Sequence, residues 1–226
     1  ELGVLYRGER ELCFLPLAHA YSCAFNFLVP MAVGAHVYLL GKVPSPKILL
    51  KAFEEVKPNL ILTVPLILEK IYKKMILPQL SKTTMKVALN IPLLDSRIYA
   101  QIRKKLVDAF GGRFREVIVG GAAMNEEVTN FLYKIKFPFT IGYGMTECGP
   151  LISYDHNDEY VPGSCGQILK GIMKVRIDSE DPYNKVGEIQ VSGENVMKGY
   201  YKNEEATSKV FTEDGWLRTG DLGTID

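Results

Sequence analysis

The sequence has few of the residues that build metal sites and disulfide frameworks. Its 226 residues include four cysteines and three histidines, and no two cysteines form a Cys-x-x-Cys pair. Neither a zinc site nor a disulfide framework is therefore indicated, and the cysteine content fits a reducing cytoplasm. We also find no secretory signal peptide, no convincing internal repeat and no low-complexity segment.

Charged residues are missing from one long segment. Residues 12–41 contain no Asp, Glu, Lys or Arg, which is the first condition for a membrane-spanning helix. The segment is interrupted, however, by Pro16, His19, Asn26, Pro30 and Gly34. No unbroken apolar run reaches the roughly 18 residues that a span requires. We therefore expect a buried strand at 12–15, a buried helix near 22–32 and a strand at 36–40, with both strands covered on two faces.

The alternation of strands and helices continues to residue 150. We expect helices that start at Ser45-Pro46, at Pro65, at Asp95 or Ser96 and at Asn125, and strands at 60–64, 114–119 and 139–141. This order predicts an α/β fold with a mostly parallel sheet and flanking helices. After residue 150, turn residues alternate with short strand-like segments at 151–154, 167–169, 174–177 and 188–191, which predicts a smaller antiparallel β subdomain. We divide the chain accordingly into residues 1–150 and residues 151–226.

The stretch Phe139–Pro150 joins a strand end to unusual chemistry. Two glycines flank Tyr143 and free the backbone from strand geometry. Thr146 and Glu147 follow, and these residue types hold phosphate oxygens and divalent cations. Two other strand ends are expected at the same edge of the sheet, Val64-Pro65 and Gly120–Ala123. Ligands of α/β sheets bind at this edge, so we predict a nucleotide site; the alternative is a tight turn with a solvated Glu147.

Four motifs follow one another along the chain. They are Gly142-Tyr-Gly-Met-Thr-Glu147, Gly187-Glu-Ile-Gln-Val-Ser-Gly193, Gly199-Tyr-Tyr201 and Gly215-Trp-Leu-Arg-Thr-Gly-Asp221. In this order they resemble the motifs of adenylate-forming enzymes, which include acyl-CoA synthetases, peptide-synthetase adenylation domains and luciferases. The segment Thr63–Tyr72 resembles the long-chain fatty acyl-CoA synthetases most. The resemblance spans essentially the whole chain and implies part of a long-chain fatty acid–CoA ligase that uses ATP, Mg²⁺ and CoA.

The resemblance also implies roles for individual residues. Adenine would lie against Gly120, Gly121 and Ala122 and stack on Tyr143, with Gly144 also at the nucleotide. Thr146 would hold the α-phosphate, Glu147 would coordinate Mg²⁺, and Asp221 would accept both ribose hydroxyls. The acid substrate is expected against His19, Gly121, Gly144 and Met145. The alternatives are ordinary turns at Gly120–Ala122 and at Asp221.

His19 bears on the substrate class. Amino-acid-activating relatives have an aspartate at this position, which pairs with the substrate amine. A neutral histidine would leave a buried ammonium unpaired, so we expect a plain carboxylate substrate. Alternatively, His19 packs in the core, and residues 12–41 either line an acyl tunnel or only build the sheet. We interpret Cys148 as a packing residue and Trp216 as a core residue.

Two parts of the family pattern are absent from this sequence. One is the Ser/Thr/Gly-rich loop that wraps the β- and γ-phosphates, and the other is the C-terminal domain with its catalytic lysine. We therefore expect the chain to be part of the large N-terminal domain, to end just before the hinge and to be inactive alone. An aryl- or medium-chain acid–CoA ligase, or a non-catalytic nucleotide- or acyl-binding relative, are the alternatives.

Charge is unevenly distributed along the chain. Residues 70–115 contain eleven Lys or Arg and two Asp, whereas residues 147–226 contain eight Lys or Arg and fifteen Asp or Glu. The basic region is either a solvated face or a contact surface for an anion. CoA and an anionic membrane are the anions that a synthetase would meet. We expect a cytoplasmic protein, either free or peripheral at the inner membrane face, with no nucleic-acid partner; its oligomeric state stays open.

Overall fold

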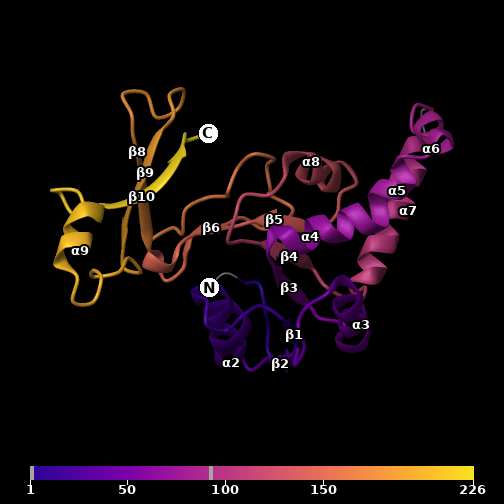
Figure 1. Cartoon of the computed structure of the whole chain (residues 1–226), viewed down its shortest axis with the longest axis horizontal. Helices are drawn as coiled ribbons and strands as arrows, with labels where there is room; N and C mark the ends of the chain where they lie inside the picture. Colours follow the sequence, from indigo (N-terminus) through magenta and orange to yellow (C-terminus); the bar gives the residue numbers. More distant parts are fainter. Residues whose placement is uncertain (1–2, 92–93) are drawn as a thin grey trace.

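Five parallel strands form the central sheet of the molecule (Figure 1), in the order β2-β1-β3-β4-β5. The computed structural model describes residues 3–91 and 94–226. The strands are β1 (Arg10–Cys13), β2 (His36–Leu39), β3 (Leu60–Thr63), β4 (Glu116–Val119) and β5 (Phe139–Ile141). Each neighbouring pair in this sheet is parallel, which confirms the predicted sheet.

Alternate strand residues are buried on opposite faces of this sheet, as the two-residue period of a strand requires. Ile61, Val117 and Val119 pack against one layer of helices. That layer contains α3 (Pro46–Val56), α4 (Pro65–Ile71), α7 (Leu94–Ala109) and α8 (Glu126–Lys134). Leu62 and Ile118 pack on the other face, against Tyr21, Phe25 and the N-terminal segment. Both faces of the inner strands β3 and β4 are covered, which explains why they are apolar. The edge strand β2 is mostly exposed, with Leu39 62% exposed, so the expectation that the strand at 36–40 is covered on two faces is wrong.

The helical segment after β1 contains a π-helical stretch. It consists of α1 (Ala20–Ser22), η1 (Cys23–Leu28) and α2 (Val29–Val33). Pro30 lies in the first turn of α2, where its missing N–H costs least, and Gly34 ends the segment at a φ of 75°. Asn26 and Pro30 are buried inside this segment, whereas Leu28 and Met31 are 56% and 61% exposed. The predicted buried helix is therefore buried on one face only. Among the residues that the structure describes, no helix is long and apolar enough to cross a membrane.

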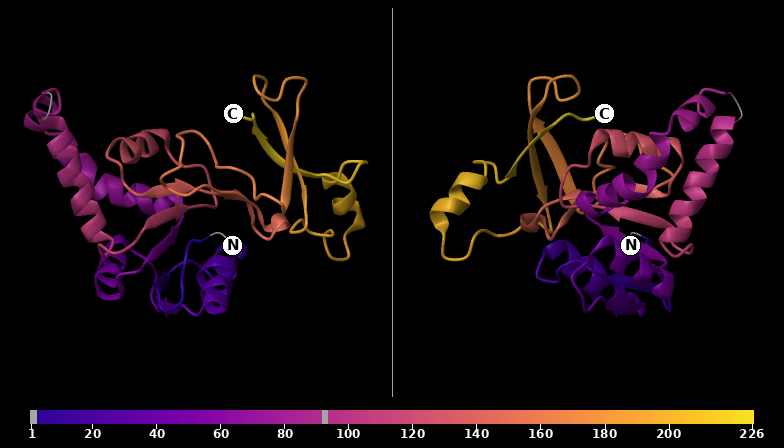
Figure 2. Two further views of the ribbon diagram at one scale, coloured as in Figure 1. Left: turned by 180° about the vertical axis from the view of Figure 1, so that it is seen from behind. Right: turned by 45° about the vertical axis from the view of Figure 1, so that its right-hand side comes forward.

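A helical projection extends from one end of the molecule. The helix α4 continues through η2 (Tyr72–Ile76) and α5 (Leu77–Leu80), and α6 (Thr83–Ala88) forms the tip before α7 returns to the sheet. Figures 1 and 2 show α6 at the end of the molecule that lies farthest from the second sheet. Met75, Ile76 and Gln79 face Ile102 and Leu106 across a small cavity, so the two arms of the projection pack together.

Two smaller antiparallel sheets follow the central one, and the three-stranded one of these is the second sheet of the molecule. The short strands β6 (Tyr143–Gly144) and β7 (Leu151–Ser153) flank the 3-10 turn η3 (Thr146–Cys148) and pair antiparallel. The three-stranded sheet β10-β9-β8 contains β8 (Met173–Asp178), β9 (Gly187–Gly193) and β10 (Leu217–Gly223), with α9 (Glu204–Val210) beside it. This confirms the predicted antiparallel sheet, and Figure 2 shows it at the end of the molecule opposite the helical projection, with the parallel sheet between them. The division at residue 150 stays a prediction.

Several predicted elements differ in detail. The first strand spans Arg10–Cys13 instead of 12–15, and the acidic side chain of Glu11 is buried within it. The apolar residues after Pro65 predict that Leu66 and Leu68 are both buried in their helix. Leu66 is exposed instead, since it lies two residues before the buried Leu68 and so on another face. Asp95 is in the first turn of α7 and does not precede it.

Two predictions for the C-terminal region are also corrected. The segment 167–169 forms only a single bridge, between Ile168 and Ser153. Trp216 is half-buried, with the Arg176 guanidinium 4.6 Å from its ring centroid, and the neighbouring Leu217 is the core residue. Asn125 and Asn203 cap α8 and α9 with their side chains, and the sequence predicts both caps.

Candidate active site

The carboxyl ends of β3, β4 and β5 open into a cavity of about 340 Å³. Val64 follows β3, Gly120 and Gly121 follow β4, and residues 142–146 follow β5, and all of them line this cavity. The segment from Leu15 to Ser22, which joins β1 to the π-helical stretch, supplies the opposite wall. The cavity therefore lies at the edge of the sheet where the sequence predicts a ligand.

Most of the predicted site residues meet at this cavity. Seven of the ten line it: His19, Gly120, Gly121, Tyr143, Gly144, Met145 and Thr146. Each of the other three is next to a residue that lines the cavity. Ala122 directly follows Gly121 and is exposed, and Glu147 directly follows Thr146. Asp221 is hydrogen-bonded to Tyr143. His19 is exposed and not in the core, so the alternative of a core histidine is wrong. The roles of these residues stay predictions.

Two glycines are needed for the shape of this wall. A Cβ atom at Gly144 would overlap the carbonyl oxygen of Pro150, because β6 and the strand that follows η3 approach closely there. Gly121 has a φ of 86°, a conformation that other residues rarely adopt. Gly144 is therefore required for the packing of two neighbouring chain segments, and Gly121 for the turn after β4.

The phenol of Tyr143 joins the two-stranded sheet, which contains β6, to the three-stranded sheet. Its hydroxyl donates a hydrogen bond of 2.7 Å to Oδ2 of Asp221, which lies on β10. Burial, together with the neighbouring Asp221 carboxylate, raises the pKa of Tyr143, so the hydroxyl remains a donor at neutral pH. The contact leaves the other Asp221 oxygen for a second partner, and it fixes the aromatic ring beside that oxygen.

Glu147 is held by a segment near the end of the chain. Its backbone carbonyl accepts a hydrogen bond of 2.7 Å from Met197, and its Oε1 accepts one of 2.8 Å from the Tyr200 hydroxyl. The hydrogen bond to Glu147 raises the pKa of Tyr200. Within residues 3–91 and 94–226 no hydrogen bond is made to Oε2 of Glu147, so this oxygen remains for a ligand.

The donor set around Glu147 contains a single carboxylate. Among the described residues, no three His, Cys, Asp or Glu side chains gather as they would around a protein-bound metal ion. Mg²⁺ is commonly held by one or two carboxylates together with the phosphate oxygens of a substrate. A single carboxylate with one free oxygen beside a phosphate site is compatible with that arrangement.

Cys148 is structural. Its side chain is buried with Ile152, Met173, Val191 and Leu217 in the core between η3 and the second sheet. Burial raises the pKa of its thiol to about 11, so the thiolate is scarce at neutral pH. This confirms that Cys148 is a packing residue.

Tyr21 was not predicted, although it lies in the same wall as His19. Its hydroxyl donates a hydrogen bond of 3.1 Å to the Ile118 carbonyl, and its ring would lie 3.2 Å from a Cβ atom at Gly120. The ring also lines a second, small apolar pocket with Phe25, Val29 and other apolar residues. Tyr21 therefore separates this pocket from the main cavity. The sequence signal that could have indicated Tyr21 as a site residue was its position two residues after His19.

The chain matches the AMP-binding enzyme family over residues 3–201. It is 29% identical over 235 residues to long-chain-fatty-acid–CoA ligase 1 of Saccharomyces cerevisiae, an alignment that covers 95% of this chain and 34% of that protein. It is 32% identical over 233 residues to 4-coumarate–CoA ligase CCL1 of Humulus lupulus, covering 98% of this chain and 37% of that protein. The chain thus spans just over a third of the length of these relatives.

Solved structures show the same fold. ATP-bound MatB from Rhodopseudomonas palustris superposes with a TM-score of 0.73 at 23% identity, covering 98% of this chain and 39% of that one. The o-succinylbenzoate coenzyme A synthetase of Bacillus subtilis, in complex with ATP and magnesium ion, gives 0.71 at 24% identity, covering 100% and 41%. The family match confirms the resemblance found in the motifs: the chain belongs to the AMP-binding enzyme family.

Proposed function

We propose that this chain forms the nucleotide- and acid-binding part of an ATP-dependent acid–CoA ligase. The observation that carries the proposal is that Tyr143 and Thr146 line one cavity at the carboxyl edge of the sheet and that Asp221 is hydrogen-bonded to Tyr143. In the proposed reaction, a carboxylate oxygen of the acid attacks the α-phosphorus of ATP and pyrophosphate leaves. The CoA sulfur then attacks the acyl carbonyl, and AMP leaves.

The nucleotide would occupy the wall that contains Tyr143. Its adenine would stack on the Tyr143 ring against the backbone of Gly120, Gly121 and Ala122, and its ribose hydroxyls would bond to the Asp221 carboxylate. Because the Tyr143 hydroxyl already holds Oδ2 of Asp221 at 2.7 Å, ring and carboxylate are fixed relative to each other before the nucleotide binds. Pre-organisation of this kind reduces the entropy lost on binding.

Thr146 and Glu147 would act at the phosphates. The Thr146 hydroxyl would bond to the α-phosphate, and Glu147 would hold Mg²⁺ through its free oxygen. Mg²⁺ would supply neutralisation of the phosphate charge. Tyr200 would keep the Glu147 carboxylate turned toward the cavity, since it bonds to Oε1 at 2.8 Å.

The acid would enter between His19 and Tyr21, and we propose a long-chain fatty acid. The support is the apolar pocket behind Tyr21, which is lined by Phe25, Val29, Leu60 and Leu62. A long acyl chain would displace the Tyr21 ring and break its 3.1 Å hydrogen bond to Ile118, whereas a compact aryl acid would leave the ring in place. An aryl acid such as 4-coumarate is therefore the second candidate, favoured by the similarity to the 4-coumarate ligase.

Acid-dependent exchange of labelled pyrophosphate into ATP tests this proposal. The full-length enzyme would be assayed with straight-chain acids of increasing length and with 4-coumaric acid. We expect exchange that rises with chain length, and we expect Tyr21→Ala to favour the longer acids further. A preference for 4-coumaric acid would support the aryl ligase, and no exchange with any acid would support a non-catalytic relative.

The chain of 226 residues alone should behave differently. We expect it to bind AMP weakly and to show no pyrophosphate exchange. The 226 residues contain neither the Ser/Thr/Gly-rich phosphate loop nor the catalytic lysine that the family pattern implies. Each missing electrostatic element should lower the rate on the order of a hundredfold or more. Acid-dependent exchange by this chain alone would contradict that expectation.

A further inference from the structure

The helical projection has apolar side chains at its outer end that nothing in the described structure covers. Val87 on α6 is 60% exposed and Ile91 is 48% exposed, and Leu77 and Leu94 are exposed on the two arms beside them. Val87 is on α6, which forms the tip of the projection at the end of the molecule far from the second sheet (Figures 1 and 2), and Leu77 and Leu94 begin the adjoining α5 and α7. Several large apolar side chains gathered at one protruding point mark an interaction surface, whereas single ones do not.

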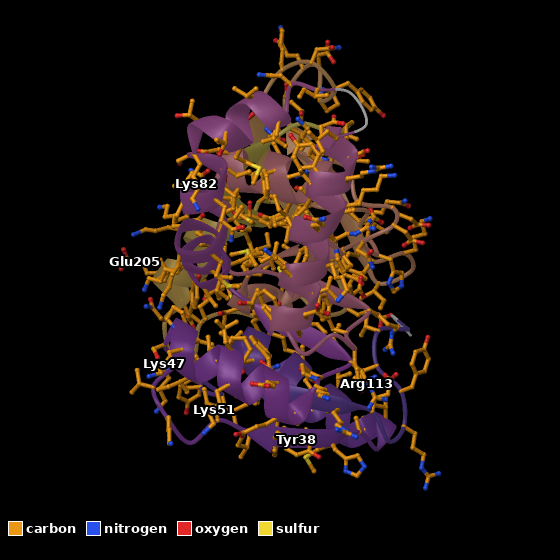
Figure 3. The ribbon with its side chains drawn as sticks, turned by 90° about the vertical axis from the view of Figure 1, so that its right-hand side faces the viewer. Tyr38, Lys47, Lys51, Lys82, Arg113 and Glu205 are labelled. Atoms are coloured by element: carbon orange, nitrogen blue, oxygen red, sulfur yellow. The ribbon has the colours of Figure 1, made fainter. Side chains whose placement is uncertain are left out.

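Cations accompany these apolar side chains. Lys73, Lys74, Lys82 and Arg97 are exposed along the projection. Within the described parts of residues 70–115, the ion pairs are Lys104 with Asp108 and Arg115 with Glu9. Neither includes Lys73, Lys74, Lys82 or Arg97, so these four cations have no carboxylate partner among the described residues. Figure 3 looks onto this end of the molecule and shows Lys82 above Lys47 and Lys51 along one edge of the view. The end that carries the exposed apolar tip is therefore also strongly positive.

We propose that this projection docks on the surface of an anionic lipid bilayer, with Val87 and Ile91 entering the interface and the cations at the headgroups. The pattern is that of interfacial amphipathic segments, which combine apolar insertion with attraction to anionic lipids. A soluble anion such as CoA would satisfy the cations and leave the apolar tip in water. A bilayer satisfies both, so the structure favours it over CoA.

The expected strength follows from the two contributions. Near an anionic surface each Lys or Arg contributes about fivefold to the partition coefficient. Removing both apolar side chains at the tip should cost roughly tenfold or more. Binding should therefore be reversible and should weaken strongly with salt, because charges at the membrane surface are screened within about a Debye length.

Co-sedimentation with vesicles tests this inference. The vesicles are phosphatidylcholine with phosphatidylserine at about three to one, with phosphatidylcholine alone as reference. We expect binding to the mixed vesicles at low salt, a loss of about 25-fold for Lys82→Gln with Arg97→Gln, and a loss of roughly tenfold or more for Val87→Ser with Ile91→Ser.

Matched controls lie at the opposite end of the molecule. Tyr183→Ser with Val186→Ser removes two apolar side chains that are 65% and 66% exposed, and Lys170→Gln with Lys198→Gln removes two exposed cations. Both controls should bind as the parent does. Circular dichroism would verify that every variant is folded.

Four outcomes would overturn the proposal. They are no binding to the mixed vesicles, equal binding to both vesicle types, equal losses in variants and controls, or displacement of the protein from vesicles by soluble CoA. No ATP or acid is present in this assay. Its result is therefore independent of whether the protein is an acid–CoA ligase.

Discussion

Tyr143 and Asp221 are 78 residues apart and are joined by a hydrogen bond of 2.7 Å. Tyr143 belongs to β6, after the end of the parallel sheet, and Asp221 belongs to β10 of the antiparallel sheet. The motif that supplies an aromatic platform is thus tied directly to the motif that supplies a carboxylate. The geometry of the candidate nucleotide site depends on this link between the two sheets.

A double-mutant cycle measures this link. Tyr143→Phe and Asp221→Ala should each lower the free energy of unfolding, and the double variant should lose less than the sum, with a coupling of about 0.5–1.5 kcal/mol. Urea unfolding of the four proteins gives the coupling. Tyr183→Phe with Asp221→Ala is the matched control, because the exposed Tyr183 lies on a different loop, and this pair should be additive. Additivity of Tyr143→Phe and Asp221→Ala would show that the hydrogen bond has no net effect.

The contact between Glu147 and Tyr200 leads to a prediction about turnover. Glu147→Gln should lower the rate of pyrophosphate exchange far more than AMP affinity, because the carboxylate acts on charge that develops in the transition state. Tyr200→Phe should lower the same rate by roughly tenfold, since it removes the 2.8 Å hydrogen bond and leaves Glu147 charged. Tyr201→Phe is the control, as Tyr201 is exposed and should not affect the rate. Equal losses of rate and affinity in Glu147→Gln would mean that Glu147 is structural.

Gly144 should tolerate no side chain. Gly144→Ala places a Cβ atom onto the Pro150 carbonyl oxygen, so the backbone around η3 must move, and we expect a loss of about 2–3 kcal/mol in the free energy of unfolding. Gly41→Ala is the control, because a Cβ atom there has no neighbour within 4 Å. Urea unfolding compares the two. A Gly144→Ala protein as stable as the Gly41→Ala protein would contradict the close approach of the two strands.

Glu11 should make stability depend on pH. Its side chain is buried in β1, Asn26 donates a hydrogen bond of 2.5 Å to Oε1, and Oε2 has no partner within residues 3–91 and 94–226. Burial raises the pKa of Glu11 to about 8, compared with 4.5 for an ordinary glutamate. Between these values the folded protein holds a proton that the unfolded chain has lost, so the free energy of unfolding falls as pH rises.

The variant Glu11→Gln removes this dependence. The free energy of unfolding of Glu11→Gln minus that of the parent should be larger at pH 8 than at pH 5, by up to about 4 kcal/mol. Urea unfolding at the two pH values gives the comparison. A pH dependence that is the same in both proteins would show that Glu11 is not buried in its neutral form.

Local sequence signals predicted the elements that surround the site. Pro46 and Pro65 begin helices, Asn125 caps α8, and the glycines after residue 119 and after residue 141 follow strand ends, as expected. These signals are reliable because each rests on the geometry of one residue and its near neighbours. They were enough to place seven of the ten predicted residues at one cavity.

Contacts between distant segments could not be predicted. Glu11 and Asn26 form a buried polar pair inside a segment that reads as apolar, and no local pattern indicates it. The Gly199-Tyr-Tyr201 motif was visible, but the contact of Tyr200 with Glu147 joins residues 53 positions apart and depends on how the two sheets pack. Tyr21 was missed for a similar reason, since its role follows from its contact with Ile118.

The most direct test of the account is AMP binding by equilibrium dialysis, because the central claim is that Tyr143 and Asp221 together hold an adenine nucleotide. We expect AMP to bind the parent protein, Tyr143→Leu to weaken binding by about tenfold through loss of the stacking ring, and Asp221→Ala to weaken it by at least as much. We expect Tyr143→Phe, which keeps the ring, to lose only about three- to tenfold. Unchanged affinity in both Tyr143→Leu and Asp221→Ala would contradict the claim.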